Sequence, residues 1–301
     1  MTGPVRPRRR AGPAVTAGRD WWGSEAACVR YGERLALDHV SFRAEPGRVS
    51  AVVGGDGAGR TTLLRCLAGV RAPSSGQVRR PARSRIGYLP AGSGTYPDLS
   101  VAENLAFRAA AYQLPPAVAR ERSGQLLERA GLAAARDRLA GQLSGGMRQK
   151  LGVIAAMLHQ PGLLVLDEPT TGVDPVSRAD LWWLIARAAA NGAAVVLATS
   201  YLDEAERAAG VLALDAGREL AHGTPAEIVA AMPGTLHASD ARPAGEARRR
   251  AWRRGGRWRI WDPDGRPDLP AATGMSLVTP DLQDAVTVAI LARELAGRDP
   301  Q

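Results

Sequence analysis

Cysteine and long apolar segments are scarce in this chain of 301 residues. Cys28 and Cys66 are the only cysteines, too few for a disulfide framework, which favours a reducing, cytosolic environment. No uninterrupted apolar run reaches the length that a membrane-spanning helix needs. No apolar segment directly follows Arg8, Arg9 and Arg10, so a secretory signal is not expected. Any membrane association is therefore expected to come through a partner or through the protein surface.

Lysine is rarer still, because Lys150 is the single lysine of the chain. The chain has 39 lysine and arginine residues against 30 acidic residues, a formal net charge of +9, and nearly all of the positive charge is carried by arginine. An excess of this size makes nucleic acid and anionic membrane surfaces candidate partners.

Composition divides the chain into three parts. Residues 1–20 are rich in Pro, Gly, Ala and Arg and predict a disordered basic arm. Residues 21–232 alternate short apolar runs with helical patterns, which predicts an α/β domain. A polar, helix-rich insertion is expected within it at about 92–160. Residues 233–301 change in composition and predict a small C-terminal α+β extension with a strand pair and a final helix.

A glycine-rich turn between a short apolar strand and an apolar helix predicts a phosphate-binding loop. Glycines at 54, 57 and 59 allow successive backbone N–H groups to point into one concavity. The helix that follows adds its positive N-terminal end, so an anion is favoured there. Thr61 stands where a hydroxyl can ligate the Mg²⁺ of a nucleoside triphosphate.

One position of this loop departs from the usual pattern, because Arg60 stands where lysine is expected. Lysine is a compact charge that reaches between phosphates, whereas arginine is a larger planar fork with a different reach. The charge is retained, so nucleotide binding is expected, while hydrolysis at this loop is expected to be impaired. The alternative explanation is the general use of arginine by a chain whose single lysine is Lys150.

Two further motifs follow the loop. A second apolar helix begins with small residues that favour an anion at its N-terminus: Ser144, Gly145 and Gly146. A buried strand at 163–166 then ends in Asp167 and Glu168. This strand delivers two carboxylates at its C-terminal end, where α/β sheets place ligand-binding groups.

Aromatic residues give two weaker indications. Tyr31 lies at a predicted turn between two strands and is a candidate for stacking on a base, or it covers a sheet edge. Arginine and tryptophan alternate at 248–261, which could hold nucleic acid by stacking and charge. The alternation of Trp258 and Ile260 fits a half-buried strand better. Direct nucleic-acid binding is therefore not expected.

The ordered set of loop, glycine-headed helix and Asp-Glu pair resembles the ATP-binding subunit of an ABC transporter, over roughly 26–232. The resemblance implies an α/β fold with a RecA-like P-loop core, an antiparallel β subdomain and an inserted helical subdomain. It also implies a head-to-tail dimer, with each ATP held between the loop of one chain and residues 143–147 of the other.

The resemblance implies ATP and Mg²⁺ as cofactors and assigns roles to individual residues. Asp167 and Thr61 are expected to orient Mg²⁺, Glu168 to activate the attacking water, and Tyr31 to stack on adenine. The remaining residues expected to bind nucleotide are Gly54, Gly55, Asp56, Gly57, Ala58, Gly59, Arg60 and Thr62 in the loop, with Ser144, Gly145 and Gly146 acting on the partner's nucleotide.

Two more positions depart from the family pattern. Ala91 stands where glutamine is usual after a strand, and Ser200 takes the catalytic place of a histidine that bonds the γ-phosphate. Together with Arg60, these changes predict a partly degenerate site and favour a heterodimer in which this chain completes a partner's site. The sequences at 200–206 and 279–285 resemble the N-terminal half of tandem bacterial multidrug-export ATPases.

The function expected from the resemblance is ATP binding and hydrolysis in a homodimer or heterodimer that drives export by a separate transmembrane permease. The location expected is the cytoplasmic face of the cell membrane, as a peripheral subunit. One alternative is a regulatory subunit that binds nucleotide without hydrolysing it. Another is a soluble ABC ATPase acting on nucleic acid or ribosomes, which the basic charge suggests and the single nucleotide domain disfavours.

Overall fold

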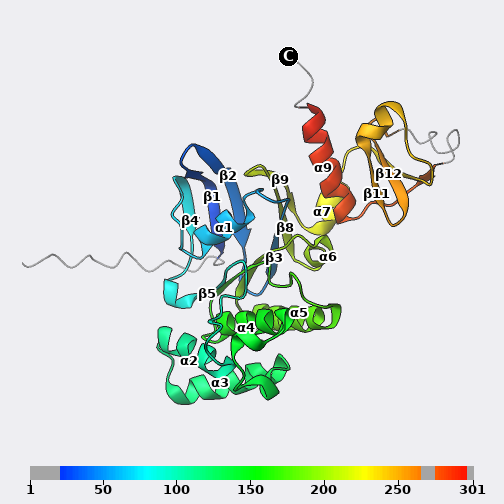
Figure 1. The fold of residues 1–301 in the computed structure, drawn as a ribbon. Coiled ribbons are helices and arrows are strands. Elements are labelled where there is room, and N and C mark those ends of the chain that lie inside the picture. The colour runs from blue at the N-terminus through cyan, green and yellow to red at the C-terminus, as the bar shows by residue number, and fades with distance from the viewer. Residues whose placement is uncertain (1–20, 266–274, 297–301) are drawn as a thin grey trace, which may run out of the picture.

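The computed structural model describes residues 21–265 and 275–296, so the predicted basic arm at 1–20 lies outside the described residues. Its centre is a six-stranded sheet with the order β5-β6-β7-β3-β8-β9 (Figure 1). The strands are β3 (Val49–Val53), β5 (Ile86–Leu89), β6 (Leu163–Asp167), β7 (Ala194–Ala198), β8 (Gly210–Asp215) and β9 (Arg218–Gly223). Neighbours pair in parallel except β8 and β9, which form an antiparallel hairpin.

The central strands are continuous apolar runs because helices cover both faces of the sheet. Successive side chains of a strand point to opposite faces, so Val53 and Val52 enter two different core clusters. One face packs against α4 (Gly145–Met157) and α5 (Pro175–Ala190), and the other packs against α1 (Arg60–Leu67). The phosphate-binding loop therefore leaves a rigid strand and enters a buried helix.

An antiparallel sheet of three strands, ordered β2-β1-β4, packs against the α1 side of the core. Its strands are β1 (Trp22–Tyr31), β2 (Arg34–Ala44) and β4 (Ser75–Arg79). The predicted hairpin turns at Gly32, which has φ 60°. This turn places Tyr31 at the end of β1, beside the phosphate-binding loop.

The predicted helical insertion contains α2 (Val101–Ala111) and α3 (Pro116–Arg129). These helices form a separate hydrophobic cluster together with residues of α4. A capping box at Ser100 starts α2, where the Ser100 hydroxyl accepts from the N–H of Glu103 and the Glu103 carboxylate accepts from the N–H of Ser100. Short 3₁₀ turns lie at Arg83–Arg85, Ala133–Ala135, Ala140–Gln142 and Gly245–Arg250.

The C-terminal part adds a four-stranded sheet, ordered β11-β12-β10-β13, and a long helix, α9 (Figure 1). Its elements are β10 (Thr235–Ser239), β11 (Ala251–Arg254), β12 (Arg257–Asp262), β13 (Ser276–Leu277) and α9 (Leu282–Ala296), after α6 (Leu202–Ala205) and α7 (Pro225–Ala230). The half-buried strand predicted around Trp258 is β12, in which Ile260 is buried. One side of α9 joins the main core through Val286, while Val288 packs with the small sheet.

Among the described residues, no helix combines the length and the apolar character that crossing a membrane requires.

Candidate functional site

The glycine-rich loop between β3 and α1 has the backbone shape that its sequence predicts. Gly54 and Gly59 have φ values of 150° and 106°, which side-chain-bearing residues rarely adopt. A Cβ at Gly54 would lie 2.3 Å from the carbonyl oxygen of Leu214, so only glycine fits there. The loop borders a cavity of about 300 Å³ lined by Tyr31, Arg34, Ala36 and residues 55–62.

The first turn of α1 leaves its backbone N–H groups available to an anion. The helix starts at Arg60, and its N-cap, Gly59, has no side chain that could accept from these donors. No acidic residue lies in the first turn to neutralise the positive end of the helix. The cavity thus combines free donors, a helix dipole and the Arg60 guanidinium, which suits phosphate groups.

Two predicted Mg²⁺ ligands meet at the edge of this cavity. Thr61 Oγ1 donates to Asp167 Oδ1 over 3.3 Å. Asp167 is 1 % exposed, and burial raises the pKa of its carboxyl, an effect that the Thr61 hydrogen bond opposes. Its other oxygen, Oδ2, is buried without a hydrogen-bond partner. A hydroxyl beside a buried carboxylate with an unpartnered oxygen fits a hard divalent cation such as Mg²⁺.

Glu168 follows β6 in an unusual backbone conformation with φ 51°. Its N–H donates to the carbonyl oxygen of Ala198 on β7, and its own carbonyl accepts from Gln149 Nε2 at 3.0 Å. These bonds hold a conformation that is sparsely populated for a non-glycine residue, and such conformations concentrate at functional sites.

The Glu168 carboxylate is held on both oxygens. Oε2 accepts from Thr171 Oγ1 at 2.8 Å and, less closely, from Ser200 Oγ at 3.3 Å. Oε1 lies 2.8 Å from Arg60 Nη1, an ion pair in which Nη1 makes no well-aligned hydrogen bond. The loop arginine and the candidate general base therefore contact each other directly.

Three further predicted positions differ in their relation to this centre. Tyr31 is 40 % exposed and lines the cavity, with the Arg71 guanidinium 4.7 Å from its ring centroid. Ser200 reaches the Glu168 carboxylate, whereas Ala91, two residues after the end of β5, brings no polar side chain. Sequence analysis missed Thr171 and Gln149 as partners of Glu168. The position of Thr171, three residues after Glu168, was the only available signal.

The second predicted anion site lies apart from the cavity of its own chain. Ser144 caps α4 by accepting from the N–H of Met147 at 3.2 Å. Gly146 lies next to the side chains of Val173 and Asp174. Neither Ser144 nor the glycines after it line the phosphate-loop cavity. A single chain thus brings together the loop, Asp167 and Glu168, but not the residues 144–146.

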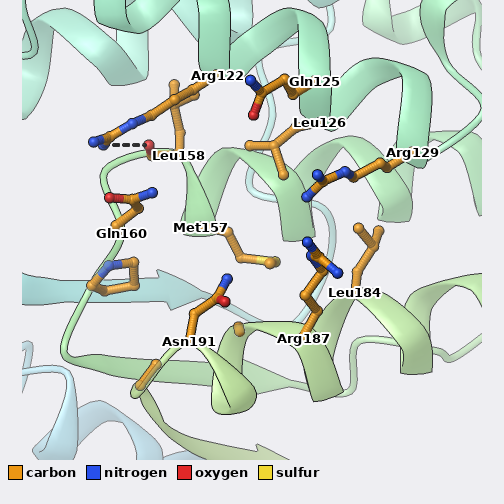
Figure 2. Close-up of a pocket in the computed structure, with 13 residues that line it drawn as sticks. Arg122, Gln125, Leu126, Arg129, Met157, Leu158, Gln160, Leu184, Arg187 and Asn191 are labelled. Carbon is orange, nitrogen blue, oxygen red and sulfur yellow. Dashed lines mark hydrogen bonds between the residues drawn. The ribbon is translucent and has the colours of Figure 1, made fainter.

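A larger cavity of about 450 Å³ lies between the helical insertion and the core. Its floor is apolar, with Leu126, Met157 and Leu184, and Figure 2 shows Arg129 from α3 and Arg187 from α5 both reaching into it. Its charged lining residues, Arg122, Arg129 and Arg187, are all arginines, so the cavity is apolar and cationic.

Comparisons with known proteins agree with this geometry. Residues 37–171 match the family described as ABC transporter. Nod factor export ATP-binding protein I of Cupriavidus metallidurans is 38% identical over 210 residues, which cover 66% of this chain and 69% of that protein. The probable multidrug ABC transporter ATP-binding protein YbhF of Escherichia coli is 40% identical over 212 residues, 67% of this chain and 37% of that longer protein.

Among solved structures, cbiO1 from Clostridium perfringens, part of the ABC transporter complex cbiONQ, superposes with a TM-score of 0.62 and 26% identity. The match covers 70% of this chain and 90% of that one.

Proposed function

This chain belongs to the family of ABC transporter ATP-binding proteins, and on that premise we propose that it binds and hydrolyses Mg-ATP to drive export through a separate membrane subunit. The observation that carries the proposal is that two cavity-lining residues at the uncapped start of α1 contact the two carboxylates after β6: Thr61 contacts Asp167, and Arg60 contacts Glu168. These groups suit the phosphates, the metal ion and the attacking water of phosphoryl transfer.

The roles proposed for the residues follow from their contacts. The loop N–H groups and Arg60 bind the phosphates, and Thr61 and Asp167 would hold Mg²⁺. When bound, Mg²⁺ would neutralise the negative charge that develops on the phosphate oxygens. Glu168 accepts a proton from the attacking water, and Thr171 and Ser200 orient its carboxylate.

A dimer is proposed because one chain does not complete the site. Residues 144–146 lie outside the phosphate-loop cavity of their own chain. A head-to-tail arrangement would bring these residues of one protomer to the nucleotide of the other, as a homodimer or with a second ATP-binding subunit. Export is proposed because the relatives include a Nod factor export ATP-binding protein and a probable multidrug ABC transporter ATP-binding protein.

The contact with the membrane subunit is proposed at the apolar, cationic cavity between α3 and α5 (Figure 2). An apolar floor with arginines and no lining carboxylate suits an acidic amphipathic segment. A chain bound in this way would be a peripheral subunit at the cytoplasmic face. The double variant Arg129→Glu/Arg187→Glu is expected to bind ADP normally but to leave the membrane fraction of its source cells.

A second candidate function is a regulatory subunit that binds ATP without turnover. The absence of a polar side chain at Ala91, the short hydroxyl of Ser200 and the engagement of Arg60 with Glu168 favour it. The intact arrangement of Asp167 and Glu168 favours hydrolysis.

Steady-state Mg-ATP hydrolysis by the purified chain, with Glu168→Gln as the blank, separates the two. Turnover per chain that exceeds the blank and increases with protein concentration supports an active dimer. Nucleotide binding without turnover supports the regulatory subunit and a separate partner ATPase. Failure to bind ATP or ADP would contradict both.

A further inference from the structure

Arg60 contacts the candidate base of its own chain while occupying the phosphate-binding turn. Its side chain is 11 % exposed, and that of Glu168 is 19 % exposed, so the ion pair is largely shielded from water. Its second contact, from Nη2 to Asp56 Oδ1, is 3.9 Å long and involves a fully exposed carboxylate. The Glu168 contact therefore dominates the placement of the guanidinium.

The same guanidinium lines the cavity where phosphates are proposed to bind. A phosphate carries more negative charge than one carboxylate and offers more acceptor oxygens to an arginine fork. Moving Arg60 onto phosphate removes the cation from Glu168 Oε1, but the two hydroxyls on Oε2 remain. The carboxylate would then keep its orientation and gain a free oxygen.

We propose that Arg60 masks the Glu168 carboxylate in the nucleotide-free chain, and that nucleotide phosphate and this carboxylate compete for its guanidinium. This inference rests on the proposed nucleotide binding at the same loop. Before nucleotide arrives, Arg60 occupies the oxygen of Glu168 that a water molecule would need. Nucleotide binding frees that oxygen, which couples occupation of the site to readiness of the base.

The competition predicts that weakening the ion pair strengthens nucleotide binding. ADP is the probe, because it is not hydrolysed, and it is titrated calorimetrically in EDTA so that a metal ion has no part. Glu168→Gln keeps the shape of the side chain and removes its charge. We expect this variant to bind ADP about fivefold more tightly than the wild type, since the partly buried pair no longer opposes transfer of Arg60.

Asp240→Asn is the matched control, because it also removes one negative charge from an ion pair with arginine, Asp240 Oδ1 lying 2.9 Å from Arg257 Nε, but does so outside the phosphate-loop cavity. We expect the dissociation constant for ADP to change by less than about twofold, since Asp240 does not line that cavity and its ion pair is exposed to solvent. Equal tightening by both variants, or an unchanged dissociation constant in Glu168→Gln, would overturn the competition. Absence of ADP binding in the wild type and in both variants would instead overturn the proposed nucleotide site, and this inference with it.

Discussion

Thr61 and Asp167 are 106 positions apart in the chain, yet the Thr61 hydroxyl donates to the Asp167 carboxylate over 3.3 Å. The contact joins the first turn of α1 to the last residue of β6. It exists because parallel strands of one sheet end at a common edge, where the loop after β3 also begins. A polar pair is thereby held at the boundary of an otherwise apolar core.

Asp167→Asn is expected to stabilise the nucleotide-free chain while abolishing Mg²⁺-dependent hydrolysis. Burial raises the pKa of the Asp167 carboxyl above its unfolded value, so its ionisation at neutral pH opposes folding. Asparagine removes that cost, and we expect a gain of about 1 kcal/mol in the free energy of unfolding at pH 7. Urea unfolding at pH 7 and at pH 4 measures it. The gain should shrink at pH 4, and an equal gain at both values would show that ionisation is not its source.

Thr171→Val is expected to lower kcat while leaving the KM for ATP nearly unchanged. The substitution removes the closest hydroxyl donor to Glu168 without touching the phosphate-binding loop. Loss of one hydrogen bond to a charged group predicts a fall in kcat of about tenfold. Thr171→Ser keeps the donor and should restore most of the rate. A serine variant as slow as the valine variant would contradict this role, and the measurement is steady-state ATP hydrolysis by the purified protein.

Gly59→Ala is expected to disrupt the loop, whereas Gly55→Ala should be tolerated. A Cβ at Gly59 would lie 2.7 Å from the Ala36 carbonyl oxygen, at a backbone φ of 106°. A Cβ at Gly55 meets no atom within 4 Å, and no positive φ is required there. We expect a loss of about 2 to 3 kcal/mol in unfolding free energy for Gly59→Ala only. Comparable denaturant midpoints for the two variants would refute the steric argument.

Mild acidification is expected to lower the free energy of unfolding of this chain through protonation of His159. The ring stacks on Tyr112 with centroids 3.5 Å apart, and burial lowers the pKa of His159 to about 4. A base whose folded pKa lies below its unfolded value stabilises the protein fully above pH 6.5, and this contribution declines as the pH falls toward 4. The expected decline is at most about 3 kcal/mol.

Chemical unfolding between pH 7 and pH 4 tests this contribution. His159→Phe keeps an aromatic ring beside Tyr112 and should flatten the pH dependence. The exposed His222 offers the control, since His222→Gln should leave the dependence as in the wild type. An unaltered slope in His159→Phe would assign the acid sensitivity to other groups.

Local patterns in the sequence determined most of the elements and the family. The strand before the loop, the apolar helix after it and the strand ending in Asp167 are each specified by neighbouring residues, through apolar runs and glycines that only certain turns accept. The strands β4, β10 and β13 were not predicted, because they are short and their pairing partners lie far away in the chain.

The contacts of the site were decided by the tertiary structure. The sequence identified Arg60, Ser200 and Glu168 as separate positions. Only the folding of the sheet brings the side chains of Arg60 and Ser200 to the Glu168 carboxylate. Thr171 carries no motif of its own, and its hydrogen bond to the Glu168 carboxylate depends on the conformation of the turn that follows β6. Sequence determines chemistry that depends on neighbours along the chain, whereas ion pairs between distant segments depend on how strands and helices pack.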